Sequence, residues 1–465
     1  MKSMEKFDFI VIGSGPAGQR AAIQAAKLGK SVALIEMHTA VGGNCLHTGT
    51  IPSKTLRETV LYLTGWRQRG FYGKSYRVKE RITAQDLVQR LDITTRHEID
   101  VIQHQLYRNG VTSIVGKARF LDKHTVRVID QDGKQKDYEA KKFLISVGTS
   151  PVQPPNIPYD GKRIINSDHI LEIEKLPRTM VVVGAGVIGV EYASIYSALD
   201  IDVTLVDGRE EMLGFLDREI IAEFTHHLRD RGVGIRMGES VEKVEYLGKE
   251  RVKLHLSSGN QLRADMVLFA AGRQGNTDDL GLEKAGLIAD KRGLIEVNEH
   301  YATKVKHIYA AGDVIGFPSL ASTSMEQGRH AACHAFGKKL DDRFSDFPFG
   351  IYAVPEMSVI GLTEKECKEK GIGYEVGEAR FRETSRGQIL GLREGLLKLL
   401  FSLDDRRLIG VHIVGEGATE LIHIGQAVMQ LGGTMDYFVH NVFNYPTLAE
   451  AYKIAALHAW NRFPD

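Results

Sequence analysis

The stretch FDFIVIGSGPAG, residues 7–18, decides the fold of this chain. Its first six residues are mostly apolar and predict a buried parallel strand, and the glycines after them predict a tight turn into a helix. The alanine-rich residues 19–28 predict that helix, which Gly29 ends. A second strand is expected at residues 31–35, closed by the acidic Glu36. The chain is therefore predicted to begin with a βαβ unit.

The same pattern recurs at residues 180–189, MVVVGAGVIG, with a helix predicted at 190–198 and a strand at 201–206 that Asp207 closes. In both copies an acid follows the glycine motif by about twenty residues, as in Rossmann dinucleotide sites. The glycines let the backbone approach a pyrophosphate at a helix N-terminus, and the acid binds ribose hydroxyls. Two such sites predict two electron carriers facing each other. The alternative is two Rossmann-like units that bind no ligand.

The composition is that of a globular protein with a large core. The chain has 465 residues, and its formal charge of +1 argues against a nucleic-acid or acidic-membrane partner. No apolar run is long enough for a membrane helix or a signal-peptide core. Three scattered cysteines predict no disulfide framework. These features favour a cytoplasmic protein without nucleic-acid or membrane partners.

The remaining sequence predicts a second type of domain near the C-terminus. Between the two glycine motifs, residues 81–109 predict a long helix and residues 113–143 predict hairpin strands around the turn Gln131-Asp132-Gly133. Beyond Phe344 the pattern becomes α+β. Strands are expected there at 396–401 and 408–414, and helices at 418–430 and 435–442.

Four motifs together resemble the flavoprotein disulfide reductases, a family that includes lipoamide dehydrogenase, glutathione reductase and mercuric reductase. They are the two glycine motifs, GGNCLHTGTIPSK at residues 42–54 and IYAAGD at residues 308–313. The resemblance implies an α/β protein with two Rossmann-like dinucleotide-binding domains and a C-terminal α+β dimerisation domain. The expected boundaries are 1–153 and 275–345 for an FAD-binding domain, 154–274 for an NAD(P)-binding domain, and 346–465 for a dimer-interface domain.

The resemblance also implies which residues bind the cofactors. For FAD these are Gly13, Gly15, Gly18, Glu36, Gly43, Cys45, Gly116, Gly312, Asp313 and Ala321. For the nicotinamide nucleotide they are Gly184, Gly186, Gly189, Asp207, Arg209 and Gly272. Asp313 would hold the ribitol hydroxyls of the flavin, and a helix from about Leu320 would point its N-terminus at the pyrimidine edge of the ring.

Lys54 and Glu191 are expected to have catalytic roles. At the matching positions of the family, a lysine and a glutamate lie beside the reactive nitrogen of the flavin. A buried cation there raises the electron affinity of the ring, and the carboxylate limits the cost of burying it. The alternative is two ordinary surface charges on helices.

The sequence departs from most of the family at two positions. Thr50 stands where a second cysteine is expected opposite Cys45, and Tyr445 stands where the family carries an acid/base histidine. The hydroxyl of Thr50 cannot form a disulfide. A tyrosine, with a pKa of about 10, is a poor proton shuttle at neutral pH. Cys45 is therefore either a small buried residue or a relic thiol. Tyr445 and Glu450 are expected to reach the flavin of a partner subunit.

The Thr-Ile-Pro-Ser-Lys and Asn-Tyr-Pro-Thr segments resemble the transhydrogenases of this family. They imply that hydride moves between NADPH and NAD through FAD, in a homodimer or larger homo-oligomer. The alternatives are a diverged lipoamide dehydrogenase or diaphorase, and a catalytically retired flavoprotein that senses nucleotides.

Asp207 and Arg209 predict how one site accepts both NAD(H) and NADP(H). The carboxylate can bind the 2′- and 3′-hydroxyls of NAD, and the guanidinium can meet a 2′-phosphate. The alternative makes Arg209 a solvated loop charge. His330 and His334 are spaced i, i+4 without a third readable ligand, so no metal site is predicted.

Overall fold

The computed structural model describes residues 4–248, 250–340 and 347–463, and the chain separates into two compact units. Unit 1 comprises residues 1–55, 88–152 and 272–342, and unit 2 comprises residues 56–87, 153–271 and 343–465. Two helices, α3 (Thr50–Leu63) and α5 (Ala84–Arg108), contribute residues to both units. The division into three domains stays a prediction.

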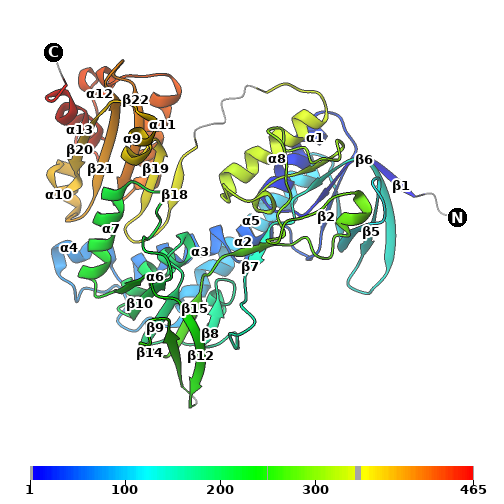
Figure 1. Cartoon of the computed structure of the whole chain (residues 1–465), viewed down its shortest axis with the longest axis horizontal. Helices are drawn as coiled ribbons and strands as arrows, with labels where there is room; N and C mark the ends of the chain where they lie inside the picture. Colours follow the sequence, from blue (N-terminus) through cyan, green and yellow to red (C-terminus); the bar gives the residue numbers. More distant parts are fainter. Residues whose placement is uncertain (1–3, 249, 341–346, 464–465) are drawn as a thin grey trace. The chain divides into compact units, whose positions relative to one another are not determined.

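Unit 1 is built on a seven-stranded sheet in the order β3-β2-β1-β6-β5-β4, with β17 also paired to β6 (Figure 1). The strands β3, β2, β1, β6 and β17 are parallel, whereas β4, β5 and β6 form an antiparallel meander. β7 and β16 form a separate antiparallel pair. The strands are β1 (Glu5–Ile12), β2 (Val32–Glu36), β3 (Thr112–Val115), β4 (Lys117–Phe120), β5 (Thr125–Ile129), β6 (Gln135–Ile145), β7 (Thr149–Pro151), β16 (Arg273–Gly275) and β17 (Ile308–Ala310).

The helices of unit 1 follow the pattern expected for a dinucleotide-binding fold. α1 follows β1 directly, and α8 packs closely against it (Figure 1). Apolar residues of β1, β2, α1 and α8 form one buried core beneath these two helices. The helical segments are α1 (Pro16–Lys27), α2 (Gly43–His47), η3 (Leu282–Ala285), η4 (Asp313–Ile315) and α8 (Ala321–Ala335).

Unit 2 contains a second parallel sheet with the order β11-β10-β9-β15-β8. A small antiparallel sheet, β12-β13-β14, comes after β11 along the chain. The strands are β8 (Ile164–Asn166), β9 (Thr179–Val183), β10 (Asp202–Asp207), β11 (Gly234–Met237), β12 (Val241–Leu247), β13 (Arg251–Leu256), β14 (Gln261–Ala264) and β15 (Met266–Phe269). The helical segments before and within this part are η1 (Trp66–Gln68), α4 (Arg69–Tyr72), η2 (His169–Leu171), α6 (Val187–Ala198) and α7 (Arg218–Asp230).

The C-terminal part of unit 2 is a five-stranded antiparallel sheet, β18-β19-β22-β21-β20, with helices around it (Figure 1). This confirms the α+β pattern expected beyond Phe344. The strands are β18 (Phe349–Ile351), β19 (Met357–Gly361), β20 (Tyr374–Arg380), β21 (Leu396–Ser402) and β22 (Leu408–Val414). The helical segments are α9 (Glu364–Lys370), η5 (Phe381–Glu383), α10 (Ser385–Leu390), α11 (Ala418–Gln430), α12 (Met435–His440) and α13 (Glu450–Trp460).

A buried lysine ties the antiparallel sheet to α7. Lys398 on β21 is fully buried, and its Nζ lies 3.0 Å from Asp217 Oδ1 and 2.7 Å from Glu219 Oε2. Asp217 is also the N-cap of α7, where its side chain accepts a hydrogen bond from Glu219 N. The start of α7 is therefore fixed by a charge that the sheet supplies.

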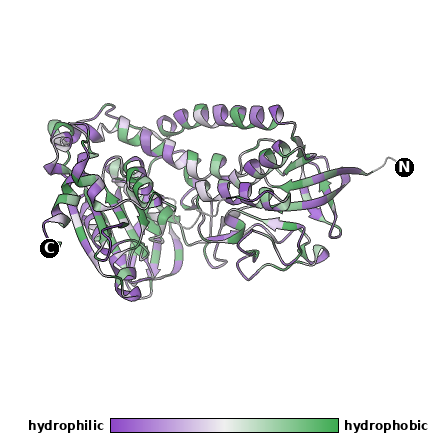
Figure 2. Ribbon diagram, turned by 90° about the horizontal axis from the view of Figure 1, so that it is seen from above, coloured by the Kyte–Doolittle hydropathy of each residue, from purple (hydrophilic) through white to green (hydrophobic). Residues whose placement is uncertain are grey.

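The ribbons of the helices alternate between hydrophilic and hydrophobic colours, as expected for helices that bury one face (Figure 2).

The sequence located most elements to within a few residues. α1 and α6 each begin three residues earlier than expected, because Pro16 and Val187 already follow the N-cap glycines Gly15 and Gly186. The long helix begins at Ala84 rather than residue 81. The segment 113–143 is not made only of hairpins, since β3 pairs in parallel with β2. In the described part of the chain, no helix is both long and apolar enough to cross a membrane.

The α1–α8 contact leads to a test of stability. A Cβ added at Gly328 on α8 would lie 2.0 Å from Ala17 O on α1, so Gly328→Ala must push the two helices apart. Such overpacking costs about 3 kcal/mol, and we expect a lower melting temperature and faster hydrogen exchange in α1 and α8. Gly214→Ala is the control, because its Cβ would meet no atom closer than 3.7 Å. Equal melting temperatures for the two variants would contradict this account of the contact.

Candidate active site

The first glycine loop has one position, Gly15, at which an added Cβ would meet no neighbouring atom. A Cβ added to Gly13 would lie 2.3 Å from Ser146 O, and one added to Gly18 would lie 1.9 Å from Gly13 O. Both positions therefore require glycine for packing. At Gly15 an added Cβ would meet no atom within 4 Å. Gly15 is also the N-cap of α1, and no side chain caps that helix. The loop therefore presents helix N–H groups beside open space, which suits a phosphate.

The carboxylate of Glu36 is held at the end of β2 by the same loop. Glu36 Oε2 accepts hydrogen bonds from Ser14 N at 3.1 Å and from Ser14 Oγ at 2.6 Å, and Glu36 Oε1 accepts one from His38 N at 3.0 Å. The backbone of Gly116 donates to Glu36 O at 2.8 Å. Gly116 has φ +151°, and a Cβ there would lie 2.5 Å from Val128 Cγ1. The structure thus brings Glu36 and Gly116 together, and their role in binding FAD stays a prediction.

A cavity opens beside Glu36. Its volume is about 390 Å³, and its wall includes Glu36 and His38 after β2, Tyr107 on α5, and Val115 on β3. This volume lies in the range of small-molecule sites. The open backbone at Gly15, the strand-end carboxylate and the cavity fit the adenosine and pyrophosphate of a dinucleotide such as FAD. Gly43, the first residue of α2, packs against this loop, since a Cβ added there would lie 2.9 Å from Gly15 Cα.

Cys45, Thr50 and Asp313 come together in unit 1. Burial raises the pKa of the Cys45 thiol, a hydrogen bond with Thr50 lowers it, and the charges of Asp313 and Lys54 act on it in opposite directions. The net effect is a raised pKa, so the thiol stays protonated at neutral pH. Cys45 is half-buried rather than fully buried, and all three cysteines of the chain are free.

Asp313 is the first residue of η4, shortly after β17. Burial raises the pKa of the Asp313 carboxyl, while Arg273 and a 3.4 Å hydrogen bond from Thr149 Oγ1 oppose that shift. Gly312 precedes it with φ +82° and donates its N–H to Gln327 Oε1. α8 begins at Ala321. The expected FAD residues therefore all lie within unit 1.

The second glycine loop repeats this geometry in unit 2. A Cβ added to Gly184 would lie 2.5 Å from Ala270 O, and one added to Gly189 would lie 1.8 Å from Gly184 O. At Gly186 the nearest atom would be Arg209 Nη2, at 3.9 Å. α6 begins after Gly186 without a side-chain cap. This loop also leaves helix N–H groups accessible to a phosphate.

Asp207 at the end of β10 is paired with Arg209. The Asp207 side chain is 8% exposed and the Arg209 side chain 58% exposed, with Arg209 Nη2 2.6 Å from Asp207 Oδ2. Burial raises the pKa of the Asp207 carboxyl, but hydrogen bonds from Arg209 and Ala185 lower it overall. Arg209 is thus no free loop charge. Gly272, which was expected at this site, lies in unit 1, where its carbonyl accepts a hydrogen bond from Val152 N.

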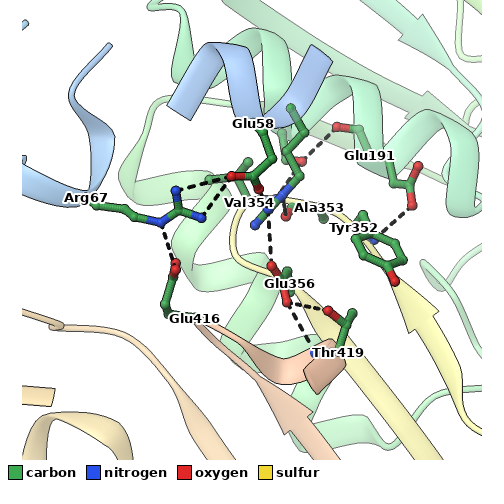
Figure 3. Close-up of polar contacts among 11 residues, drawn as sticks. Glu58, Arg67, Glu191, Tyr352, Ala353, Val354, Glu356, Glu416 and Thr419 are labelled. Carbon is green, nitrogen blue, oxygen red and sulfur yellow. Dashed lines mark hydrogen bonds and ion pairs between the residues drawn. The ribbon is translucent and has the colours of Figure 1, made fainter. Parts of the chain in front are cut away.

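Glu191 is buried on α6, so it is no ordinary surface charge. Its Oε1 accepts a hydrogen bond from Tyr352 N at 2.8 Å, and Ser194 Oγ accepts one from Val354 N at 3.0 Å (Figure 3). α6 therefore holds the backbone that runs from β18 towards β19. Lys54 lies in unit 1 and Glu191 in unit 2, and their pairing stays a prediction.

A buried arginine on α3 holds the same backbone. Arg57 Nε donates to Ala353 O at 2.9 Å, and its Nη1 lies 2.6 Å from Glu58 Oε1 and 3.2 Å from Glu356 Oε1. Glu356 Oε2 also accepts hydrogen bonds from the N and Oγ1 of Thr419 (Figure 3). Arg57 and Glu356 were not among the residues predicted from the sequence. Arg57 lies one helical turn after Lys54 on α3, but nothing in the sequence identifies a partner 296 residues away.

Tyr445 and Glu450 lie in the C-terminal part of unit 2, near α13. Tyr445 is exposed, and its phenol shares a hydrogen bond with the hydroxyl of Ser385. Glu450 is the first residue of α13, and its Oε2 is buried without a hydrogen-bond partner among the residues that the structure describes. Among the described residues, the phenol of Tyr445 therefore bonds to Ser385 and not to Glu450.

The family model for pyridine nucleotide-disulphide oxidoreductases matches residues 7–328, and the model for the dimerisation domain of that family matches residues 347–456. The chain belongs to this family. Within the described ranges, no three His, Cys, Asp or Glu side chains lie close enough to hold a metal ion together.

The chain is similar over its full length to proteins named soluble pyridine nucleotide transhydrogenase. It is 53% identical to one from Mycobacterium bovis, over 99% of this chain and 98% of that protein. It is 44% identical to one from Colwellia psychrerythraea, over 99% of this chain and 100% of that protein. Its structure resembles the HOCl-induced flavoprotein disulfide reductase RclA from Escherichia coli, in a Cu(II) complex, with a TM-score of 0.87 and 28% identity over 98% and 99% of the two chains.

The buried and exposed ion pairs of Figure 3 should differ in their effect on stability. Glu356→Ala removes a partner from Arg57, whose side chain is 3% exposed, and should lower the free energy of unfolding by about 3 kcal/mol. Arg67→Ala breaks a pair with Glu416 whose side chains are 41% and 29% exposed, and should cost about 0–1 kcal/mol. Chemical denaturation followed by fluorescence measures both. Similar losses for the two variants would show that burial does not decide the strength of these pairs.

Proposed function

We propose that this chain is an FAD-dependent transhydrogenase that moves hydride between NADPH and NAD without a redox-active disulfide. The hydroxyl of Thr50 facing the half-buried Cys45 carries this proposal. A disulfide reductase needs two sulfurs at that point, and Cys45 has no second thiol to pair with. The two glycine loops, each with a strand-end carboxylate, support one site for FAD and one for a nicotinamide nucleotide.

The chain's own residues have few tasks in this reaction. Bound FAD supplies the chemistry by accepting a hydride from one nucleotide and returning it to the other. The first loop and Glu36 hold the adenosine and pyrophosphate of FAD, and Asp313 holds its ribitol. Lys54 and Glu191 support the reactive part of the ring. Hydride transfer needs close, aligned rings rather than a proton donor, so neither a thiol nor a histidine at position 445 is required.

The nicotinamide nucleotides bind in turn at the second glycine loop. Gly184, Gly186 and Gly189 let the pyrophosphate approach the start of α6, while Asp207 and Arg209 lie where the adenosine ribose is bound. The resemblance to the family also assigns Gly272 to this nucleotide. This assignment makes NAD(H) and NADP(H) alternative occupants of a single site.

The chain associates with a second copy through its C-terminal domain. This part of the chain matches a dimerisation domain, and large apolar side chains lie exposed on and after α12, including Tyr437, Val442 and Tyr445. Glu450 follows this segment in the sequence, and its buried Oε2 has no hydrogen-bond partner among the described residues. A partner subunit would supply that hydrogen bond. Tyr445 and Glu450 would then face the flavin of that subunit. We also propose a cytoplasmic location and no nucleic-acid or membrane partner.

The activity is tested with FAD-loaded protein, NADPH and thio-NAD, beside NADH with lipoamide. We expect rapid thio-NAD reduction, little lipoamide turnover, and retention of most of the thio-NAD rate in Cys45→Ser, because no step uses the thiol. Lipoamide turnover that Cys45→Ser abolishes would instead identify a single-thiol reductase. Absence of both reactions in the unaltered protein would favour a retired nucleotide sensor.

The dimer surface is tested by placing a charge on it. Val442 is 94% exposed, and Val442→Asp should weaken dimerisation because it would bury a carboxylate in the interface. Sedimentation velocity measures the monomer–dimer equilibrium. Ile288→Asp is the control, since Ile288 is 74% exposed in unit 1. A Val442→Asp protein as dimeric as the Ile288→Asp protein would place the interface elsewhere.

A further inference from the structure

The carboxylate of Asp207, at the end of β10, has its whole acceptor capacity occupied by Arg209 and Ala185. Asp207 Oδ1 accepts hydrogen bonds from Arg209 N at 2.8 Å and Arg209 Nε at 3.0 Å. Asp207 Oδ2 accepts hydrogen bonds from Ala185 N at 2.5 Å and Arg209 Nη2 at 2.6 Å. An ionised carboxylate offers about four lone-pair sites, and all of them are occupied. A ribose diol can reach Asp207 only by displacing Arg209.

The guanidinium of Arg209, in contrast, still has donors to offer. Of its five N–H groups, the pair with Asp207 uses one on Nε and one on Nη2. The side chain is 58% exposed, and Nη2 lies near the open backbone position at Gly186. A 2′-phosphate can therefore bind the outward N–H groups while the ion pair stays intact.

The first glycine loop provides an internal comparison. Glu36 occupies the position that Asp207 has in the second unit, but its side-chain partner is the neutral hydroxyl of Ser14. With the backbone N–H groups of Ser14 and His38, Glu36 accepts three hydrogen bonds in the described part of the chain, and only one of these is to Oε1. A ribose hydroxyl can bind there without displacing a cation. The competing arginine is a feature of the second loop.

We infer that Arg209 has two opposed effects on the same site: it competes with the ribose hydroxyls of NAD(H) for Asp207, and it binds the 2′-phosphate of NADP(H). The side chain thus lowers the affinity for the smaller nucleotide and raises the affinity for the larger one. Both effects bring the two affinities closer together, which suits a site that must accept both substrates in turn. This inference rests on the assignment of the second loop to the nicotinamide nucleotide.

The strengths of the two effects differ. The ion pair is more than half exposed on the arginine side, so releasing Asp207 should raise the affinity for NAD(H) only about 2- to 5-fold. A charge-assisted contact to phosphate is stronger, and its loss should lower the affinity for NADP(H) about 10- to 100-fold. Arg209→Met should therefore change the two affinities in opposite directions.

The test uses fragments that lack the nicotinamide ring. FAD-loaded protein is titrated by calorimetry with ADP-ribose and with 2′-phospho-ADP-ribose, in the unaltered chain and in Arg209→Met. We expect tighter binding of the first fragment and weaker binding of the second. Arg209→Lys keeps the charge but loses the bidentate hydrogen-bond geometry of the guanidinium. It should retain part of the affinity for 2′-phospho-ADP-ribose and bind ADP-ribose more tightly than the unaltered chain.

Arg236→Met is the matched control, because Arg236 is a neighbouring arginine, 40% exposed, that pairs with Glu239 instead of Asp207. It should change neither affinity by more than about 2-fold. Unchanged or weaker ADP-ribose binding in Arg209→Met would overturn the competition, even if phosphate binding fell. Because the fragments carry no hydride, this result is independent of the thio-NAD assay, which alone decides whether the chain is a transhydrogenase.

Discussion

The contacts of unit 2 depend on how one short stretch of backbone, residues 352–354, satisfies its hydrogen bonds. These residues lie between β18 and β19, where side chains replace the partners that a strand would supply: Glu191 and Ser194 accept the N–H groups of Tyr352 and Val354, and Arg57 donates to the carbonyl of Ala353. An unmade bond at any of these buried groups would cost roughly 1–3 kcal/mol. The stretch thereby joins α3, α6 and the antiparallel sheet into one unit.

The two glycine loops share one scaffold but surround their strand-end carboxylates differently. Each places a backbone N–H, of Ser14 or Ala185, on the carboxylate at the end of the next strand, because the tight glycine turn brings these groups together. The residues around that carboxylate then differ. A hydroxyl beside Glu36 suits a cofactor that remains bound, whereas a displaceable guanidinium beside Asp207 suits ligands that exchange.

Features that depend on local geometry could be predicted from the sequence. The glycines at 13, 18, 184 and 189 are required by close backbone approaches, so their spacing predicted both loops and the acids at the ends of the next strands. The sequence did not reveal Arg57 and Glu356, because a buried ion pair between distant segments leaves no periodic signal. It placed Asp207 and Arg209 in the same site, but not the hydrogen bonds that make them compete with ligands. Those bonds depend on side-chain conformations that only the folded chain fixes.

The hydrogen bond between Cys45 and Thr50 has a consequence for the setting in which the protein works. An enzyme with a dithiol exchanges electrons with glutathione and thioredoxin, so its resting state follows the thiol balance of the cell. Here the thiol is protonated, its neighbour is an alcohol, and the other two cysteines are buried. If the proposed mechanism holds, a shift of the glutathione pool would find no redox-active disulfide at this site. On the proposed mechanism, the resting state of the protein would follow the nicotinamide pools.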